Sequence, residues 1–168
     1  MPTRPLLERI DADWRRVRPG LDPTPMRRII LLARTAAQLA RAVEQVQGHH
    51  GLNSAQADLL FTLYRSAPAE GLTPGDLAAL SAITPASITN RLDTLTERGL
   101  ISRETDPADA RSRRVQLTAA GRDRVEALLP DHLRNEQRLL STLSEPEQTE
   151  LERLLLKLVV GMEGREES

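Results

Sequence analysis

Cysteine is absent from the 168-residue chain, which excludes disulfide bonds, thiolate metal sites and cysteine nucleophiles. The three histidines leave little for a metal cluster, and two of them, His49 and His50, are adjacent. No apolar run approaches the roughly 18 residues that a membrane span requires. The first residues include acids and Trp14, unlike the basic and apolar regions of a signal peptide. These absences predict a soluble, cytoplasmic protein with no metal, no cofactor and no membrane partner.

Sequence signatures of enzymes are also missing. The chain has no glycine-rich phosphate loop, no metal-ligand spacing and no nucleophile elbow. His132, a conceivable general base, falls in a segment with helical periodicity and has no such motif nearby. We therefore expect a binding protein rather than an enzyme.

Lysine is nearly absent, since Lys157 is the one exception among 23 basic residues and the others are arginine. The formal net charge is −1, which by itself argues against a nucleic-acid partner. The distribution of charge along the chain, however, argues for a nucleic-acid partner. Five arginines lie within 14 residues and are opposed there only by Asp123: Arg111, Arg113, Arg114, Arg122 and Arg124. Arginine is suited to bidentate contacts with phosphates and bases, so this segment predicts a basic surface.

Apolar residues recur at helical spacing in three N-terminal segments. The first covers 6–17, and the second covers 26–47 after a linker rich in proline and glycine (19–25). A third helix follows Asn53 or Ser54 as its cap. The expected apolar faces are Leu6, Leu7, Ile10, Trp14 and Val17 in the first helix, Ile29, Leu32, Ala36, Leu39, Val43 and Val46 in the second, and Leu59, Leu60 and Leu63 in the third.

Residues 72–118 carry the most informative order of elements. Threonine–proline pairs at 73–74 and 84–85 each indicate a helix start, because threonine caps a helix and proline fits its first turn. The first helix has Leu77 and Leu80 on its apolar face, and the second runs to about Arg98 and stops at Gly99. Strands at 100–104 and 114–117 then flank a polar turn at 106–112. Two short helices followed by a charged hairpin are the order of a winged helix-turn-helix.

Helices are expected on both sides of this lobe. Thr118 caps a long helix with a kink at Pro130, and Ser144 with Glu147 forms a capping box for the last helix. The C-terminal helices have wide apolar faces: Val125, Leu128, Leu129, Leu133, Leu140, Leu151, Leu154, Leu155, Leu158, Val159 and Met162. Because exposed stripes of this length normally pair with another chain, we expect a homodimer; a monomeric bundle closing on itself is the alternative.

The expected fold is therefore mainly α with a small β-hairpin wing. It is a single domain, 1–168, in which 52–118 form the winged helix-turn-helix lobe and 1–50 and 119–168 form dimerisation helices. At about 100° per residue, Ile88, Leu92 and Leu95 face the core of the second short helix. Ala86, Asn90, Asp93 and Glu97 lie on the opposite, exposed face, with Thr89 and Thr94 beside them. The N-terminal half of this face is small and hydrogen-bonding, which suits a major groove, or else it is an ordinary solvated face. The candidates for DNA contact on this helix are Ser87, Thr89, Asn90 and Thr94.

Four arginines, one on this helix and three in the hairpin, have more specific predicted roles. Arg91 is half turned inward and needs a partner, which is either a structural ion pair or an anionic ligand. In the hairpin, Asp109 lies two residues before Arg111, so it could orient that arginine at the tip for entry into a minor groove. Arg113 and Arg114 are then expected to contact phosphates, unless the hairpin is merely a charged, soluble turn.

The sequence resembles the MarR family of dimeric regulators across this lobe. The residues that carry the resemblance are Leu77-Ala78, Thr89-Asn90-Arg91-Leu92, Gly99-Leu100-Ile101, Asp106-Pro107-Ala108-Asp109 and Val115-Gln116-Leu117-Thr118-Ala119-Ala120-Gly121. Further matches resemble the urate-responsive branch of that family: Asp13-Trp14, Asp58-Leu59-Leu60 and Leu63-Tyr64-Arg65-Ser66-Ala67-Pro68. The wing departs from the pattern, because Ala110 stands where such families usually have the first of two arginines.

The resemblance implies a repressor whose binding to a pseudo-palindromic DNA operator is relaxed by urate or a related purine metabolite. The ligand residues of that branch fall on Trp14, Asp58, Arg91 and Arg103 in this sequence. A tryptophan face and arginine donors suit a planar anion, and an anion that competes for Arg91 and repels Asp58 would shift the recognition helix. Three alternatives remain for these residues and for the lobe: core packing of Trp14 with a structural Asp58–Arg91 pair, a winged helix used only for protein contacts, and the same DNA-binding function with a phenolic or other aromatic anion.

Overall fold

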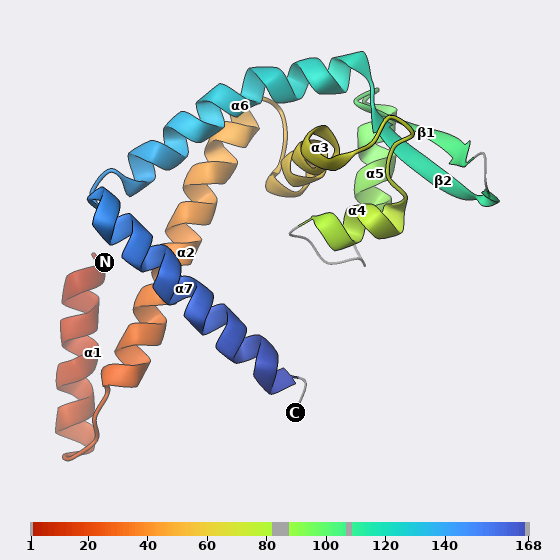
Figure 1. Cartoon of the computed structure of the whole chain (residues 1–168). Helices are drawn as coiled ribbons and strands as arrows, with labels where there is room; N and C mark the ends of the chain where they lie inside the picture. Colours follow the sequence, from red (N-terminus) through yellow and green to blue (C-terminus); the bar gives the residue numbers. More distant parts are fainter. Residues whose placement is uncertain (1, 82–87, 107–108, 167–168) are drawn as a thin grey trace. The chain divides into compact units, whose positions relative to one another are not determined.

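The computed structural model describes residues 2–81, 88–106 and 109–166, and for 106 and 109–112 the backbone alone. Its described parts form seven helices and one two-stranded antiparallel sheet (Figure 1), which confirms the mainly α fold with a hairpin wing. The chain divides into two compact units, Met1–Ser54 and Ala55–Ser168.

The first unit consists of helix α1 (Thr3–Val17) and helix α2 (Thr24–His49). Arg27 on α2 lies 3.3 Å from the buried carboxylate of Asp11 on α1. Placing Pro25 in the linker was wrong, since α2 already begins at Thr24 and includes that proline in its first turn. Proline is tolerated there because the first N–H groups of a helix have no intrahelical partner.

The core of the second unit begins with helix α3 (Ser54–Ser66). Leu59, Leu60 and Leu63 on this helix are buried, as the periodicity predicts. They belong to a core that continues through the rest of the unit and includes Leu72, Leu77, Ile88, Leu92, Leu95, Leu100, Ile101, Val115, Val125 and Leu128.

Helix α4 (Pro74–Leu80) has the start that the sequence predicts. The Thr73 hydroxyl accepts from the backbone N–H of Asp76, whose carboxylate in turn accepts from the backbone N–H of Thr73, so the two residues form a capping box. The apolar face is narrower than expected, because Leu77 is fully buried while Leu80 is 45% exposed.

The hairpin is longer than the sequence suggests. Strand β1 (Ile101–Asp106) pairs with strand β2 (Asp109–Leu117) from Ile101↔Leu117 to Asp106↔Asp109, with an irregularity after Thr105. The expected turn at 106–112 therefore belongs largely to the strands, because cross-strand pairing overrides the polar composition of the segment. An isolated bridge between Leu72 and Val115 joins the hairpin to the segment before α4.

Two long helices complete the second unit. Helix α6 (Ala119–Leu140) starts at the predicted cap, Thr118, and runs on through Pro130. Helix α7 (Glu145–Glu166) follows Ser144, whose backbone N–H and hydroxyl both donate to Glu147 and lower the pKa of that carboxyl. The apolar stripe of α7 is exposed: Leu151, Leu154, Leu155, Leu158, Val159 and Met162. Among the described helices, none is both long and apolar enough to cross a membrane.

At Gly121, α6 lies very close to the backbone at the start of the hairpin. A Cβ atom at this position would lie 2.0 Å from the carbonyl oxygen of Leu100 and 3.2 Å from the side chain of Leu117. Only glycine therefore allows the first turn of α6 to lie against the start of β1.

We expect Gly121→Ala to lower the free energy of unfolding by at least about 1–3 kcal/mol, because the added methyl overlaps a backbone carbonyl. Gly75→Ala on α4 is the matched control, since its Cβ would meet only Thr73, at 3.7 Å. That variant should stay within about 1 kcal/mol of the parent. Urea unfolding at one protein concentration measures both, and equal stability of the two variants would show that the junction adjusts.

Candidate nucleic-acid interface

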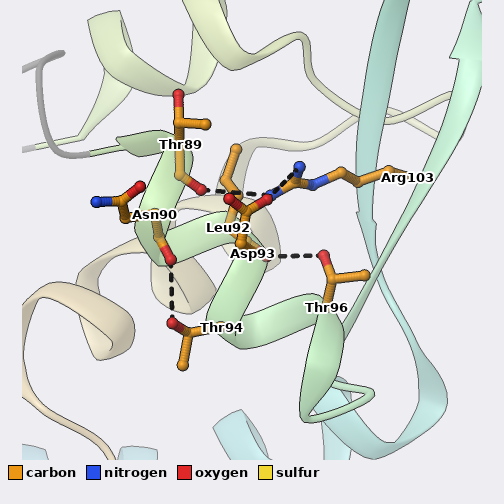
Figure 2. Close-up of polar contacts among 7 residues, drawn as sticks. All are labelled: Thr89, Asn90, Leu92, Asp93, Thr94, Thr96 and Arg103. Carbon is orange, nitrogen blue, oxygen red and sulfur yellow. Dashed lines mark hydrogen bonds and ion pairs between the residues drawn. The ribbon is translucent and has the colours of Figure 1, made fainter.

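Helix α5 (Ile88–Glu97) separates an apolar face from a small polar face. Ile88, Leu92 and Leu95 are at most 3% exposed and join the core, as their angles predict. Exposed on the other side are Thr89, Asn90, Asp93, Thr94 and Glu97. In Figure 2 the Asn90 side chain points away from the hairpin, with Thr89 and Thr94 one residue before it and one turn after it.

The C-terminal end of α5 is fixed by its connection to the hairpin. Gly99 has a φ of +67°, a conformation that glycine adopts without strain, so the chain reverses there as predicted. The backbone N–H of Leu100 donates to the Leu95 carbonyl, and the N–H of Thr118 donates to the Leu100 carbonyl. Leu100 thus joins the end of α5 to the two strands at the open end of the hairpin, where β1 starts and β2 ends.

Arg103 on β1 connects the hairpin to the exposed side of α5 (Figure 2). Its Nη1 lies 2.8 Å from the carboxylate of Asp93, and its Nη2 donates to the carbonyl oxygen of Thr89 at 3.5 Å. Because Thr89 and Asp93 are one turn apart, a single guanidinium spans a full turn of the helix.

Two further arginines tie the helices of the lobe to one another. Arg98, just after α5, donates to the side-chain oxygen of the buried Gln56 on α3 at 3.2 Å. Arg65 at the end of α3 donates to the carbonyl oxygen of Leu80, the last residue of α4, at 2.7 Å. The Arg65 contact places a positive charge at the C-terminus of α4, where it is favourable.

The hairpin arginines differ in their surroundings. Arg113 is exposed and donates to the Thr105 hydroxyl across the strand pair at 2.8 Å. Arg114 is half-buried and donates to the Gly71 carbonyl at 3.2 Å, so part of its guanidinium is occupied within the lobe. Arg122, by contrast, lies over the ring of Tyr64, 5.6 Å from its centroid, which is a cation–π distance.

The structure brings together only some of the residues expected to contact DNA. Thr89, Asn90 and Thr94 lie on one exposed side of α5, and Arg113 lies on the adjoining hairpin. Ser87 falls outside the described residues, as do the side chains of Asp109 and Arg111.

The four expected effector residues fall in both units. Trp14 lies on α1, where it lines an open hollow of about 330 Å³ with Ile10, Asp13 and Val17. Asp58 on α3, Arg91 on α5 and Arg103 on β1 belong to the second unit. Arg91 is half-buried, as its angle predicts.

Two of these arginines have N–H groups without acceptors. Among the described residues, the buried Nη1 of Arg91 and the buried Nε of Arg103 have no hydrogen-bond partner. A buried donor without an acceptor is costly, so each is a place where an added acceptor would be favourable.

Reasoning from the sequence alone missed two residues that connect α5 to its neighbours, Asp93 and Arg98. Asp93 appears there only as an exposed residue, and Arg98 only as a helix end. The partner of Asp93 comes from the next strand and that of Arg98 from α3, so neither contact has a local spacing signal.

Comparisons with known proteins agree with this architecture. The family model described as MarR family matches residues 50–112. The transcriptional regulator PecS of Dickeya dadantii is 34% identical over 146 residues, which cover 87% of this chain and 88% of PecS.

Two solved structures of regulators extend the comparison. The DNA complex of MepR from S. aureus has a TM-score of 0.69 at 27% identity, covering 84% of this chain and 99% of MepR. A structure of BpsR from Bordetella bronchiseptica, whose DNA binding is regulated by 6-hydroxynicotinic acid, has a TM-score of 0.68 at 27% identity. It covers 77% of this chain and 96% of BpsR. With its helix-turn-helix, hairpin and extended similarity to PecS, the chain belongs to the MarR family of winged helix-turn-helix transcriptional regulators.

Proposed function

We propose that this regulator is a homodimeric repressor that leaves a pseudo-palindromic operator when it binds an aromatic anion, with urate or a related purine metabolite as the first candidate. The observation that carries the DNA-binding part is the exposed side of α5, where Thr89, Asn90 and Thr94 adjoin the arginine-bearing hairpin. The solved MepR complex with DNA supports this use of the fold.

In this proposal α5 enters the major groove. Thr89, Asn90 and Thr94, together with Ser87, contact base edges or phosphates, and the Asn90 amide is suited to pair with adenine. Arg111, oriented by Asp109, enters the adjoining minor groove, and Arg113 contacts phosphates.

The exposed apolar side chains of α7 support the homodimer. Six of them lie at helical spacing and are between 36% and 58% exposed, which is unusual for an isolated soluble chain: Leu151, Leu154, Leu155, Leu158, Val159 and Met162. Two copies related by a two-fold axis would bury this surface and present two recognition helices to two half-sites.

The unsatisfied donors on Arg91 and Arg103 support an anionic effector. A planar anion offers acceptors to guanidinium groups, and the family resemblance assigns these arginines, with Asp58 and Trp14, to urate. An anion that binds Arg91 on α5, or that draws Arg103 away from α5, would change operator affinity. About 1–3 kcal/mol of coupling corresponds to a 5- to 150-fold effect.

A different aromatic anion is the second candidate. The BpsR structure favours it, because 6-hydroxynicotinic acid regulates the DNA binding of that relative. Urate and this pyridine acid share a flat ring and acceptor oxygens, so the same two arginine donors suit either ligand.

The dimer is tested by Leu155→Asp on α7. A charge placed within an apolar interface lacks a partner, so this variant should become monomeric or aggregate while the parent remains dimeric. Multi-angle light scattering measures the mass, and Arg153→Gln on the same helix, which removes an exposed ion pair with Glu150, is the control. A stable Leu155→Asp dimer would exclude this part of α7 from the interface.

The DNA contacts are tested by comparing Asn90→Ala with Arg113→Ala. Loss of the amide should relax base preference within each half-site, at a cost of about 1–3 kcal/mol for the preferred base. Loss of the arginine should weaken binding to all sequences alike and reduce the salt dependence by about one phosphate contact. Fluorescence anisotropy with matched and mutated duplexes separates the two patterns, and parental affinity in both variants would contradict the assignment.

The effector is tested through Trp14, the one tryptophan of the chain. Urate should quench the fluorescence of Trp14 in a saturable manner, after correction for absorption by the ligand. This quenching should accompany release of operator DNA. Arg91→Ala should abolish both, whereas Asp58→Asn should retain ligand binding and release DNA less effectively. Xanthine, 6-hydroxynicotinate and 4-hydroxybenzoate titrated in parallel identify the preferred class. Parental DNA binding at millimolar urate, together with a response to a phenolic or pyridine acid, would favour the second candidate.

A further inference from the structure

We infer that Asp93 and Arg103 act as a positioning pair that sets the angle between the base-reading helix α5 and the hairpin, and that Asp93 thereby increases operator specificity although its charge opposes DNA. The inference rests on the proposed role of α5 as the recognition helix. It assigns a function to an acidic residue that has no direct use in binding DNA.

The contact is made at two points on the helix. One guanidinium nitrogen of Arg103 lies 2.8 Å from the Asp93 carboxylate, and the other donates to the Thr89 carbonyl at 3.5 Å (Figure 2). Two contacts one turn apart restrain rotation as well as distance, and the planar arginine fork suits such a bridge better than a lysine would.

The electrostatics of Asp93 distinguish it from an ordinary surface acid. Its side chain is 51% exposed on the side of α5 that also carries Thr89 and Asn90. A carboxylate so placed repels phosphates, so its neutralisation alone should strengthen DNA binding. The Arg103 side chain, only 26% exposed, offsets this charge. Glu97, one turn later on α5, has no ion pair within the described part of the chain.

On the hairpin side, Arg103 lies in a well-paired part of the sheet. Arg103 pairs with Val115 across the sheet, and the fully buried Val115 also forms the bridge to Leu72. Arg113, the proposed phosphate contact, lies two residues before Val115 on the same strand. The Asp93–Arg103 pair therefore fixes the position of the base-reading side chains on α5 relative to the phosphate-contacting Arg113 on the hairpin.

The test compares Asp93→Asn with Glu97→Gln in the full-length protein. Both substitutions remove one negative charge from the exposed side of α5, but only the first removes the partner of Arg103. Two probes are used: a duplex of about 30 base pairs selected by the parent protein from a randomised library, which accommodates two half-sites one turn apart, and a scrambled duplex of the same composition.

Asp93→Asn should bind the selected duplex about tenfold more weakly, equal to about 1.4 kcal/mol, and the scrambled duplex as well as the parent or better. Glu97→Gln should bind both duplexes as well as the parent or slightly better. The inference is overturned if Asp93→Asn retains or improves its affinity for the selected duplex, since the acid would then be only a repulsive surface charge.

Arg103→Gln and the double variant complete a thermodynamic cycle. The loss of affinity for the selected duplex in the double variant should be smaller, by about fivefold or more, than the product of the two single losses. The salt dependence should stay at the parental slope in Arg103→Gln, because a positioning residue neutralises no phosphate. Additive effects, or a slope reduced by about one phosphate contact, would assign Arg103 to the DNA instead.

Failure of this inference differs from failure of the proposed function. If the parent protein selects no sequence from the library, α5 does not act as proposed. If the parent selects a sequence and Asp93→Asn binds it equally well, the recognition role stands and the positioning role is wrong. Unfolding curves of all variants exclude loss of the fold as the cause.

Discussion

The backbone around Leu100 is the constraint on which the DNA-binding lobe depends. Leu100 donates to the end of α5 and accepts from Thr118, and its carbonyl lies against Gly121 at the first turn of α6. Helix α5, the two strands at the open end of the hairpin and the start of α6 therefore meet at one residue. Each of these contacts involves backbone atoms of Leu100, and the space at Gly121 is too small for a Cβ atom.

Several arginines of the same lobe bind the protein itself. Arg65, Arg103 and Arg114 donate to backbone carbonyls of Leu80, Thr89 and Gly71, and Arg98 donates to Gln56. The contacts of Arg65 and Arg114 satisfy carbonyl groups at a helix end and in a loop, which would otherwise rely on water. A cluster of arginines in this sequence is thus partly a set of internal clamps, and exposed members such as Arg113 supply the surface charge.

More of the fold than of the candidate site could be predicted from the sequence. Local signals, such as the Thr73 and Thr118 caps and the spacing of Ile88, Leu92 and Leu95, predict the helices because the physics they reflect acts within a few residues. The local sequence pattern predicts strands that are too short, since strand pairing near the tip of the hairpin depends on the partner strand. The Arg103–Asp93 bridge could not be predicted, because it joins residues of different elements with no shared periodicity.

The shortage of lysine has a consequence for regulation and for chemical labelling. The one lysine, Lys157, lies on α7, far along the chain from the recognition helix and the hairpin. Acetylation neutralises lysine but not arginine, so no side chain of the winged lobe is open to this modification. Amine-reactive dyes and cross-linkers would likewise attach to a side chain only on α7, so they leave the side chains of the winged lobe unlabelled.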